Sequence, residues 1–287
     1  MAEGTTVTEA EIGTAQLAPK DLQKDRTEFL LKEKRDPLEL LKAYVQSSKL
    51  VGLGEAHNSP AMENFVRNSL EALKTSGLTH LVIEEYDDYQ PEVDNYMQTG
   101  EMSSKLADYL THGFIRNDAN HNLRVRLLQE ARRLGLQVQF IDPGNTPDRE
   151  QYLTDKVRPL MEQEGTKILM IYGNMHIAKG NLPVSGGTHV MGRLNDLYPG
   201  MTKSVMRFSD KRHGGYLERE IYDDSQSAKV DKASFAIEVK NSPYANESLF
   251  DPKIASPKVG NLVDAFIYHS GDITLPRPAQ PRPDLIK

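Results

Sequence analysis

Short apolar runs alternate with amphipathic segments through the middle of the chain. The runs at residues 49–54, 80–83, 136–142 and 167–172 have the length of buried strands. Between residues 60 and 76, apolar side chains recur at positions i, i+3, i+4 and i+7, which is the spacing of one helix face. Helical connections of roughly 15–25 residues between such strands are typical of parallel pairing. We therefore predict an α/β fold with a mostly parallel central sheet and helices on both faces.

The same patterns continue toward both ends of the chain. Further helices are predicted at residues 38–45, 123–134, 147–164 and 190–197, and further strands at 203–208, 234–239 and 264–269. No repeat of fixed period is visible, which favours one layered domain over a solenoid. We divide the chain into a loosely ordered N-terminal arm (1–36), one α/β catalytic domain (37–274) and a proline-rich tail (275–287).

Composition removes several kinds of chemistry. The 287 residues include no cysteine, which excludes a disulfide scaffold, a thiolate zinc site and a thiol nucleophile. With 35 Lys and Arg against 41 Asp and Glu, the formal net charge is −6, which argues against a nucleic-acid partner. No apolar stretch is long enough to span a membrane, and the first residues do not resemble a secretory signal. We expect a cytoplasmic protein, with secretion or translocation by a route other than a Sec leader left open.

Acidic and imidazole side chains follow four of the predicted strands. Glu55 and His57 come after the first strand, and Glu84 comes after the second. Asp142 follows the third strand and His176 follows the fourth. In a parallel sheet the carboxyl ends of the strands meet at one edge, and ligands bind beyond that edge. We therefore predict that these five residues converge on one site.

Both histidines of this set lie in Gly-x-x-His segments, at residues 54–57 and 173–176. Glycine lets the chain turn tightly after the strand, so that the histidine can point back over the edge. Two imidazoles and a carboxylate can bind a divalent metal with an open position for water. Without a metal, one histidine can take a proton from water, a glutamate can orient it, and the second histidine can stabilise an oxyanion. Because the motif is short, two unrelated loop histidines are the alternative.

Three residues near these strand ends are predicted to contact a substrate: Arg116, Asp142 and His189. Arg116 can bind a carboxylate through two hydrogen bonds, although it and Arg124 also fit a solvated helix face. The glycine-rich residues 185–187 precede His189 at the start of a helix, where an anion can bind. The alternative for this loop is a flexible rim.

Other polar positions and loops surround the predicted site. Glu85 follows Glu84 directly, and strand alternation predicts that the two side chains point to opposite faces, so one of the two lies in the site. Ser59 fits the cap of the following helix better than a nucleophile, which leaves water as the expected nucleophile. Substrate choice is expected to depend on the loops at residues 85–120 and 180–200.

Several of these segments together resemble the erythromycin esterase/ChaN-like superfamily. That superfamily includes erythromycin esterases, ChaN-type haem-uptake lipoproteins, the TIKI/TraB proteases with paired Gly-x-x-His motifs, and Ras/Rap1-cleaving toxin domains. The resemblance covers about half of the chain. It is carried by Val51-Gly-Leu-Gly-Glu-Ala-His-Asn-Ser-Pro60, Leu81-Val-Ile-Glu84 and Ile171-Tyr-Gly-Asn-Met-His176, and also by the segments at 86–91 and 127–136.

The resemblance implies a catalytic site made of Glu55, His57, Glu84 and His176, and metal ligands His57, His176 and Glu84 if a metal is used. It implies hydrolysis of an ester or amide bond in a peptide, a protein or a small ester. For that reaction we predict His57 as the general base to water, and His176 as the group that stabilises charge or completes a metal site. The alternative function is a haem- or metal-binding ChaN-like protein without turnover. The cofactor is therefore left open between none, a divalent metal ion and haem. The chain has no lipidation cysteine, which argues against a haem-uptake lipoprotein.

Overall fold

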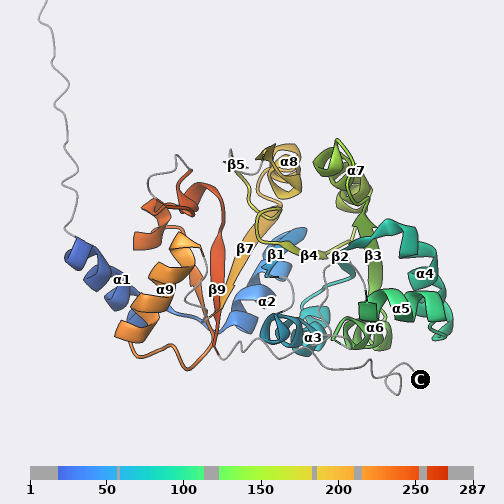
Figure 1. Ribbon diagram of the computed structural model, residues 1–287, viewed down its shortest axis with the longest axis horizontal. Helices are drawn as coiled ribbons and strands as arrows, with labels where there is room; N and C mark the ends of the chain where they lie inside the picture. Colours follow the sequence, from blue (N-terminus) through green and yellow to red (C-terminus); the bar gives the residue numbers. More distant parts are fainter. Residues whose placement is uncertain are drawn as a thin grey trace, which may run out of the picture.

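His57 and Arg116, two of the predicted site residues, lie outside the part of the chain that the computed structural model describes. Within the described part, a central seven-stranded sheet has helices on both faces (Figure 1). None of the described helices has the length and apolarity needed to cross a membrane. The described residues are 19–56, 59–112, 123–182, 186–209, 215–251 and 257–270.

Seven apolar runs of the sequence form the central sheet. The strands are β1 (Leu50–Glu55), β2 (His80–Tyr86), β3 (Gln137–Asp142), β4 (Ile168–Gly173), β7 (Thr202–Ser209), β8 (Phe235–Glu238) and β9 (Ala265–His269). Their spatial order is β3-β2-β4-β1-β7-β9-β8, and every neighbouring pair is parallel except β8 with β9. The predicted fold class is therefore confirmed. A short antiparallel pair, β5 (Asn181–Leu182) and β6 (Gly187–Thr188), lies apart from this sheet.

The described helices include five that the apolar spacing predicts and four that it does not. The predicted ones are α2 (Pro37–Ser47), α3 (Pro60–Thr75), α6 (Leu123–Arg133), α7 (Arg149–Glu162) and α8 (Val190–Leu197). The others are α1 (Pro19–Glu33), α4 (Gln90–Thr99), α5 (Ser104–His112) and α9 (Tyr216–Ser227). Helices α4 and α5 lie where a loop was expected, and α4 buries only Val93 and Tyr96, which are too few apolar positions to mark a helix face. Ser59 caps α3 as predicted, accepting a hydrogen bond from the Met62 amide at 3.2 Å.

Alternation along the strands divides the core between the two faces of the sheet. Leu81 and Ile83 of β2 pack with residues of α3 and α6, whereas Val82 between them packs with residues of α7 and α8. Successive side chains of a strand point to opposite faces, so both faces of β2 are apolar and both are covered. Figure 1 shows α2, α3, α5 and α6 on one side of the sheet and α7 and α8 on the other. Polar residues that continue β2 therefore also alternate between the two faces.

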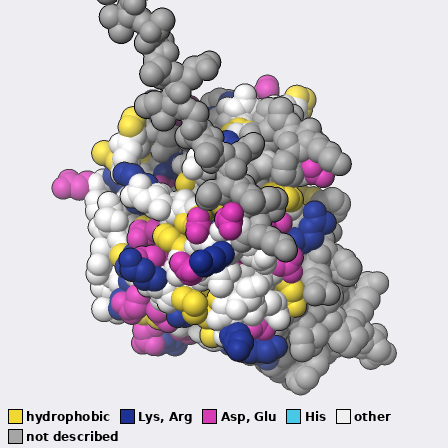
Figure 2. Space-filling view, turned by 90° about the vertical axis from the view of Figure 1, so that its left-hand side faces the viewer, with side chains coloured by type: hydrophobic (Ala, Val, Ile, Leu, Met, Phe, Trp, Pro, Cys, Tyr) yellow, Lys and Arg dark blue, Asp and Glu magenta, His cyan; other side chains and the backbone are white. Residues whose placement is uncertain are grey.

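Part of the segment expected to be a loosely ordered arm is helix α1, which packs against α9. Arg26 of α1 is only 3% exposed and makes ion pairs with Glu220 and Asp224 of α9 and with Glu247. Leu30, also in α1, is completely buried. Figure 2 shows the molecule from this side, with acidic and basic side chains interspersed. Ion pairs rather than an apolar stripe anchor α1, which is why apolar periodicity does not predict it. The domain limits at residues 36 and 274 stay predictions.

Groups from outside the sheet pair with the backbone at both of its edge strands. At the β3 edge, the side-chain amide of Gln90 accepts a hydrogen bond from the Phe140 amide (2.6 Å) and donates one to the Val138 carbonyl (3.1 Å). At the β8 edge, the backbone of Arg35 forms an antiparallel bridge with Ala236, with two hydrogen bonds of 2.9 Å. Both edges thus have part of their hydrogen-bonding groups satisfied within the chain.

His269, at the end of β9, makes the stability of the protein dependent on pH. Its side chain is 2% exposed and packs edge-on against the Phe65 ring at 5.1 Å. Burial, reinforced by the nearby Arg207 guanidinium, lowers the pKa of His269 to about 3. The unfolded histidine titrates near 6.5, so between these values the unfolded state binds a proton that the folded state does not. Stability contributed by neutral His269 is therefore present near pH 7 and is lost as the pH falls toward 3.

Replacement of His269 by leucine is expected to remove this pH dependence. The wild-type free energy of unfolding should fall by about 2 kcal/mol more than that of His269→Leu between pH 7 and pH 5, because only the wild type has this site to protonate on unfolding. Urea unfolding of both proteins at the two pH values measures the difference. An equal fall in both proteins would contradict the assignment.

Candidate functional site

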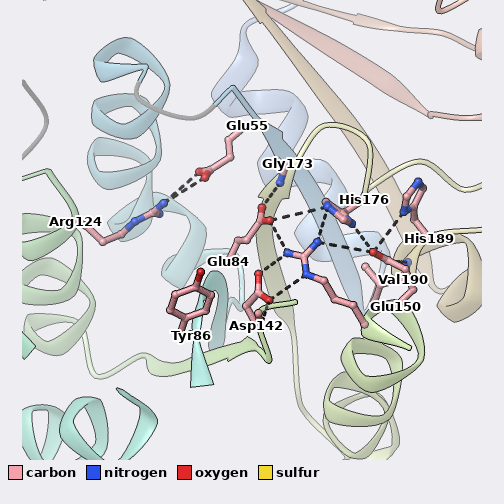
Figure 3. A network of polar contacts seen from close by, with 12 residues as sticks. Glu55, Glu84, Tyr86, Arg124, Asp142, Glu150, Gly173, His176, His189 and Val190 are labelled. Atoms are coloured by element: carbon pink, nitrogen blue, oxygen red, sulfur yellow. Dashed lines mark hydrogen bonds and ion pairs between the residues drawn. The ribbon is translucent and has the colours of Figure 1, made fainter. Parts of the chain in front are cut away.

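The carboxyl edge of the sheet has two polar clusters, one on each face. Glu84 of β2 points to the α7 side, where its Oε1 accepts a hydrogen bond from Arg149 at 2.8 Å. Glu85 points to the α6 side, where its Oε1 lies 3.1 Å from Nε of Arg124. The predicted opposite orientation of Glu84 and Glu85 is thus confirmed. Glu55 at the end of β1 contacts Arg124 as well (Figure 3), so it lies on the same α6 side as Glu85.

Arg149 is the centre of the first cluster and is the first residue of α7. Its Nε donates to Oδ1 of Asp142 at 3.0 Å, and its Nη2 contacts both Asp142 Oδ2 and Glu84 Oε1. Asp142 and Glu84 are 5% and 4% exposed, so the guanidinium neutralises carboxylates that have little access to water. We call this group the Arg149 cluster; its members are Glu84, Asp142, Arg149, Glu150, His176 and His189.

His176 connects the guanidinium to a further carboxylate. Its Nε2 lies 2.9 Å from Nη1 of Arg149, and its Nδ1 lies 2.7 Å from Oε1 of Glu150. A guanidinium has only donors, so Nε2 must accept this hydrogen bond, and the proton of a neutral ring then lies on Nδ1, on the side of Glu150. The contacts therefore assign neutral His176 to the tautomer with its lone pair on Nε2. An imidazole oriented by a carboxylate in this way is the arrangement of a general base.

Glu150 links α7 to α8 and to both histidines. Its Oε2 accepts a hydrogen bond from the Val190 amide, the first residue of α8, at 2.7 Å. Its Oε1 lies 3.4 Å from Nδ1 of His189 as well as close to His176 (Figure 3). Burial would raise the pKa of Glu150, but hydrogen bonds with His176, His189 and Val190 outweigh burial and hold this pKa well below its usual range. Glu150 is therefore ionised at neutral pH.

Backbone groups fix the remaining parts of this edge. Oε2 of Glu84 accepts a hydrogen bond from the Gly173 amide at 2.6 Å, which joins β2 to the end of β4. Gly54 in β1 lies so close to Asn174 that an added Cβ would be 2.0 Å from its Oδ1. The side chain of Asn174 also pairs with the backbone of Arg207, with hydrogen bonds of 2.8 and 3.0 Å. Gly54 is thus required by close packing of the loop that carries His176.

Arg124 is the centre of the second cluster, on the opposite face. Its Nη2 lies 3.3 Å from Oε1 of Glu55 and 4.0 Å from Oε1 of Glu63, and Tyr109 donates to Oε2 of Glu85 at 2.8 Å. Arg124 is 2% exposed, so its assignment to a solvated helix face is wrong. Burial favours the neutral form, but the surrounding carboxylates, Glu63 and Glu55 foremost, raise the pKa of Arg124 above its usual value.

The structure brings together only part of the predicted site. Glu84, Asp142, His176 and His189 belong to the Arg149 cluster, whereas Glu55 contacts Arg124 on the other face. The Val190 amide at the N-terminus of α8 donates to the Glu150 carboxylate, and the binding of a substrate anion near His189 stays a prediction. The catalytic, metal and substrate roles assigned from the sequence stay predictions.

Sequence reasoning missed Arg149, Glu150 and the buried position of Arg124. Arg149 and Glu150 occupy the first turn of the helix after β3, which begins at the same edge of the sheet as the other site residues. A search of the first turns of helices after each strand would have found both residues. Arg124 precedes the buried Leu127, Leu128 and Ala131 by three, four and seven residues, so this helical spacing does indicate that Arg124 is buried.

Similar solved structures share this fold. A protein from Bacillus cereus matches with a TM-score of 0.67 at 14% identity, covering 86% of this chain and 97% of its own. A succinoglycan biosynthesis protein matches at 0.66 and 12%, covering 88% and 96%. A mutant of the erythromycin esterase EreC in its open conformation matches at 0.60 and 12%, covering 85% and 97%. No family model and no curated protein matches the sequence. The chain has the erythromycin esterase-like fold, which confirms the sequence resemblance at the level of fold.

Replacement of Arg124 by methionine is expected to destabilise the fold strongly. It would leave Glu55 and Glu85 buried beside an apolar side chain, and removing one partner of a buried ion pair costs about 3–5 kcal/mol. Arg126→Met, on the exposed side of the same helix, is the matched control and should change stability by about 0.5 kcal/mol or less. Urea unfolding measures both values. Similar midpoints for the two variants would show that Arg124 is dispensable.

Proposed function

We propose that the protein is a hydrolase that cleaves an ester or amide bond with water as the nucleophile, at the Arg149 cluster. The observation that carries the proposal is the 2.7 Å contact between Glu150 and Nδ1 of His176. With the ring proton on Nδ1 beside Glu150, the lone pair of Nε2 points toward Arg149. The side chain of Arg149 is 24% exposed, so solvent can reach this part of the cluster. The erythromycin esterase-like fold is compatible with this chemistry.

In the proposed reaction, a water molecule replaces Arg149 as the hydrogen-bond partner of Nε2. As water attacks the carbonyl carbon, Nε2 of His176 takes its proton, and the charge of Glu150 stabilises the imidazolium. The tetrahedral intermediate then collapses, and the imidazolium gives the proton to the departing alcohol or amine. One water is consumed, and a carboxylic acid is released with the alcohol or amine.

Arg149 is proposed to stabilise the oxyanion of the intermediate. Its Nη1 lies 2.9 Å from Nε2 of His176, so a carbonyl attacked by water at Nε2 would lie within reach of the guanidinium. Glu84 and Asp142 orient that guanidinium through their hydrogen bonds. A fixed cation at the position of developing charge lowers the barrier without reorganisation cost.

Glu55 and His57 are proposed to act at the same edge from the neighbouring strand. Sequence analysis assigned the base to His57, whereas the contact with Glu150 favours His176 for that role. His57, two residues after Glu55 in the sequence, is then proposed as the second acid–base group. Peptides, proteins and small esters are all proposed substrates, and a cytoplasmic location is proposed with them.

Haem binding without turnover is the alternative function from sequence analysis. A haem titration of the purified protein distinguishes the two functions, because a Soret band would indicate an axial ligand such as histidine. The alternative function also includes binding of a metal ion without turnover, and three ligands for such an ion are proposed below.

His176→Ala is expected to abolish most of the turnover. Removing the base should lower kcat by about 10²–10⁴-fold, and Glu150→Gln should lower it by about 10²-fold or more by releasing the imidazole. A panel of lactones, aryl esters and peptides, assayed with the wild type first, identifies the substrate for these measurements.

His80→Asn is the matched control, since His80 begins β2 at the opposite end of the strand from Glu84 and Glu85. It should retain wild-type kcat. Circular dichroism of each variant shows whether the fold is kept. A folded His176→Ala protein with wild-type kcat would exclude His176 as the base.

A further inference from the structure

We propose that Glu150, His176 and His189 bind a divalent cation of the zinc type. Each residue offers one ligand atom, a carboxylate oxygen or an imidazole nitrogen, that lies within 4.8 Å of those of the other two. The three residues come from α7, from the loop after β4 and from the position before α8, so the fold rather than local sequence brings them together. Two imidazoles and one carboxylate with an open fourth position are the donor set of many zinc sites.

The distances between these atoms are close to those of a coordinated ion. Oε1 of Glu150 lies 2.7 Å from Nδ1 of His176 and 3.4 Å from Nδ1 of His189. Ligands bound tetrahedrally at about 2.0–2.1 Å are separated by about 3.4 Å. A small outward movement of His176 is therefore enough to admit the ion. The two rings meet edge to face with centroids 5.0 Å apart, so their planes do not block each other.

The carboxylate is held in the orientation that such a site requires. The Val190 amide occupies Oε2 of Glu150 at 2.7 Å and leaves Oε1 directed at both histidines (Figure 3). A backbone group that fixes a ligand from outside the coordination sphere is typical of metal sites. The pKa of Glu150 is held below its usual range, so the carboxylate is ionised when the ion arrives.

The charge of the surroundings favours a cation. Glu84, Asp142 and Glu150 contribute three negative charges and Arg149 one positive charge, a formal sum of −2. Arg149 lies 4.0 Å from Oε1 of Glu150, but its charge is matched by its contacts with Glu84 and Asp142. The side chains of His176, Glu150 and His189 are 18%, 19% and 7% exposed, which leaves the ion a route from solvent and room for water.

This ligand set differs from the one that the sequence predicts. Sequence analysis placed the metal on His57, His176 and Glu84. Both oxygens of Glu84 already accept hydrogen bonds, one from Gly173 and one from Arg149. Its Oε1 lies 4.0 Å from Nε2 of His176, which is the nitrogen opposite the one that faces Glu150. The two sets therefore use different nitrogens of His176 and can be separated by substitution.

The consequence for turnover, unlike the binding itself, rests on the proposed function. When the ion binds Nδ1 of His176, the ring proton moves to Nε2, so the imidazole stays neutral but Nε2 loses its lone pair and must move away from the donor-only guanidinium of Arg149. His176 can then no longer accept a proton from water at Nε2. Bound cation is thus expected to inhibit the hydrolase.

Titration of the chelator-treated full chain with Zn²⁺, and with Co²⁺ as a visible probe, tests the binding. Calorimetry should give one ion per chain, and Co²⁺ should show the absorption of a site with nitrogen ligands. His189→Ala and Glu150→Gln should each weaken binding by at least about 100-fold, since each removes one of three protein ligands. His80→Asn is the control histidine and should bind as the wild type does. His189→Gln serves as a second variant if His189→Ala does not fold.

Two results would overturn the site: a wild type that binds no ion, or folded His189 variants that bind as tightly as the wild type. Loss of binding in His57→Ala with retention in His189→Ala would assign the ion to the sequence-predicted ligands instead. These measurements need no substrate, so they decide the site even if no hydrolysis is found. With a substrate in hand, Zn²⁺ that activates the wild type would overturn the inhibition while leaving the binding intact.

Discussion

Carboxylates that end buried strands must have positive partners inside the fold, because an isolated buried charge costs more free energy than a domain's net stability. Arg149 supplies that partner to Glu84 and Asp142 on the α7 side of the sheet. Arg124 supplies it to Glu55 and Glu85 on the α6 side. Both arginines lie in the first turns of helices, Arg124 in α6 and Arg149 in α7, so the start of each helix supplies the positive charge that the carboxylates at the sheet edge require.

The pairing of charges also organises the chemistry of the edge. The guanidinium of Arg149 contacts Nε2 of His176, and the carboxylate of Glu150 contacts Nδ1. The two nitrogens of one imidazole therefore face groups of opposite charge. The carboxylate of Glu150 is in turn fixed by the backbone at the start of α8. The tautomer of His176 thus depends on how α7 and α8 pack together, and not only on the strand that precedes it. Substitutions between these two helices should therefore affect the site without touching it.

Apolar runs were sufficient to predict all seven strands, because most of their side chains are buried on one face of the sheet or the other. Alternation then placed Glu84 and Glu85 on opposite faces. The sequence could not place Arg149 and Glu150, since their position depends on the length of the loop between Asp142 and α7. It also could not predict α1, whose anchor is the ion-paired Arg26, because a partner in α9 far along the chain is invisible to local spacing.

The side-chain amide of Gln90 on β3 and the backbone of Arg35 on β8 have a consequence for self-association. An open edge strand offers a ladder on which a second copy, or an unfolded neighbour, can add a strand. Here groups of the protein itself already occupy part of each edge. The side-chain amide of Gln90 hydrogen-bonds to the backbone of β3, and the backbone of Arg35 forms one bridge with β8. Addition of a strand from a second copy would first have to displace these groups.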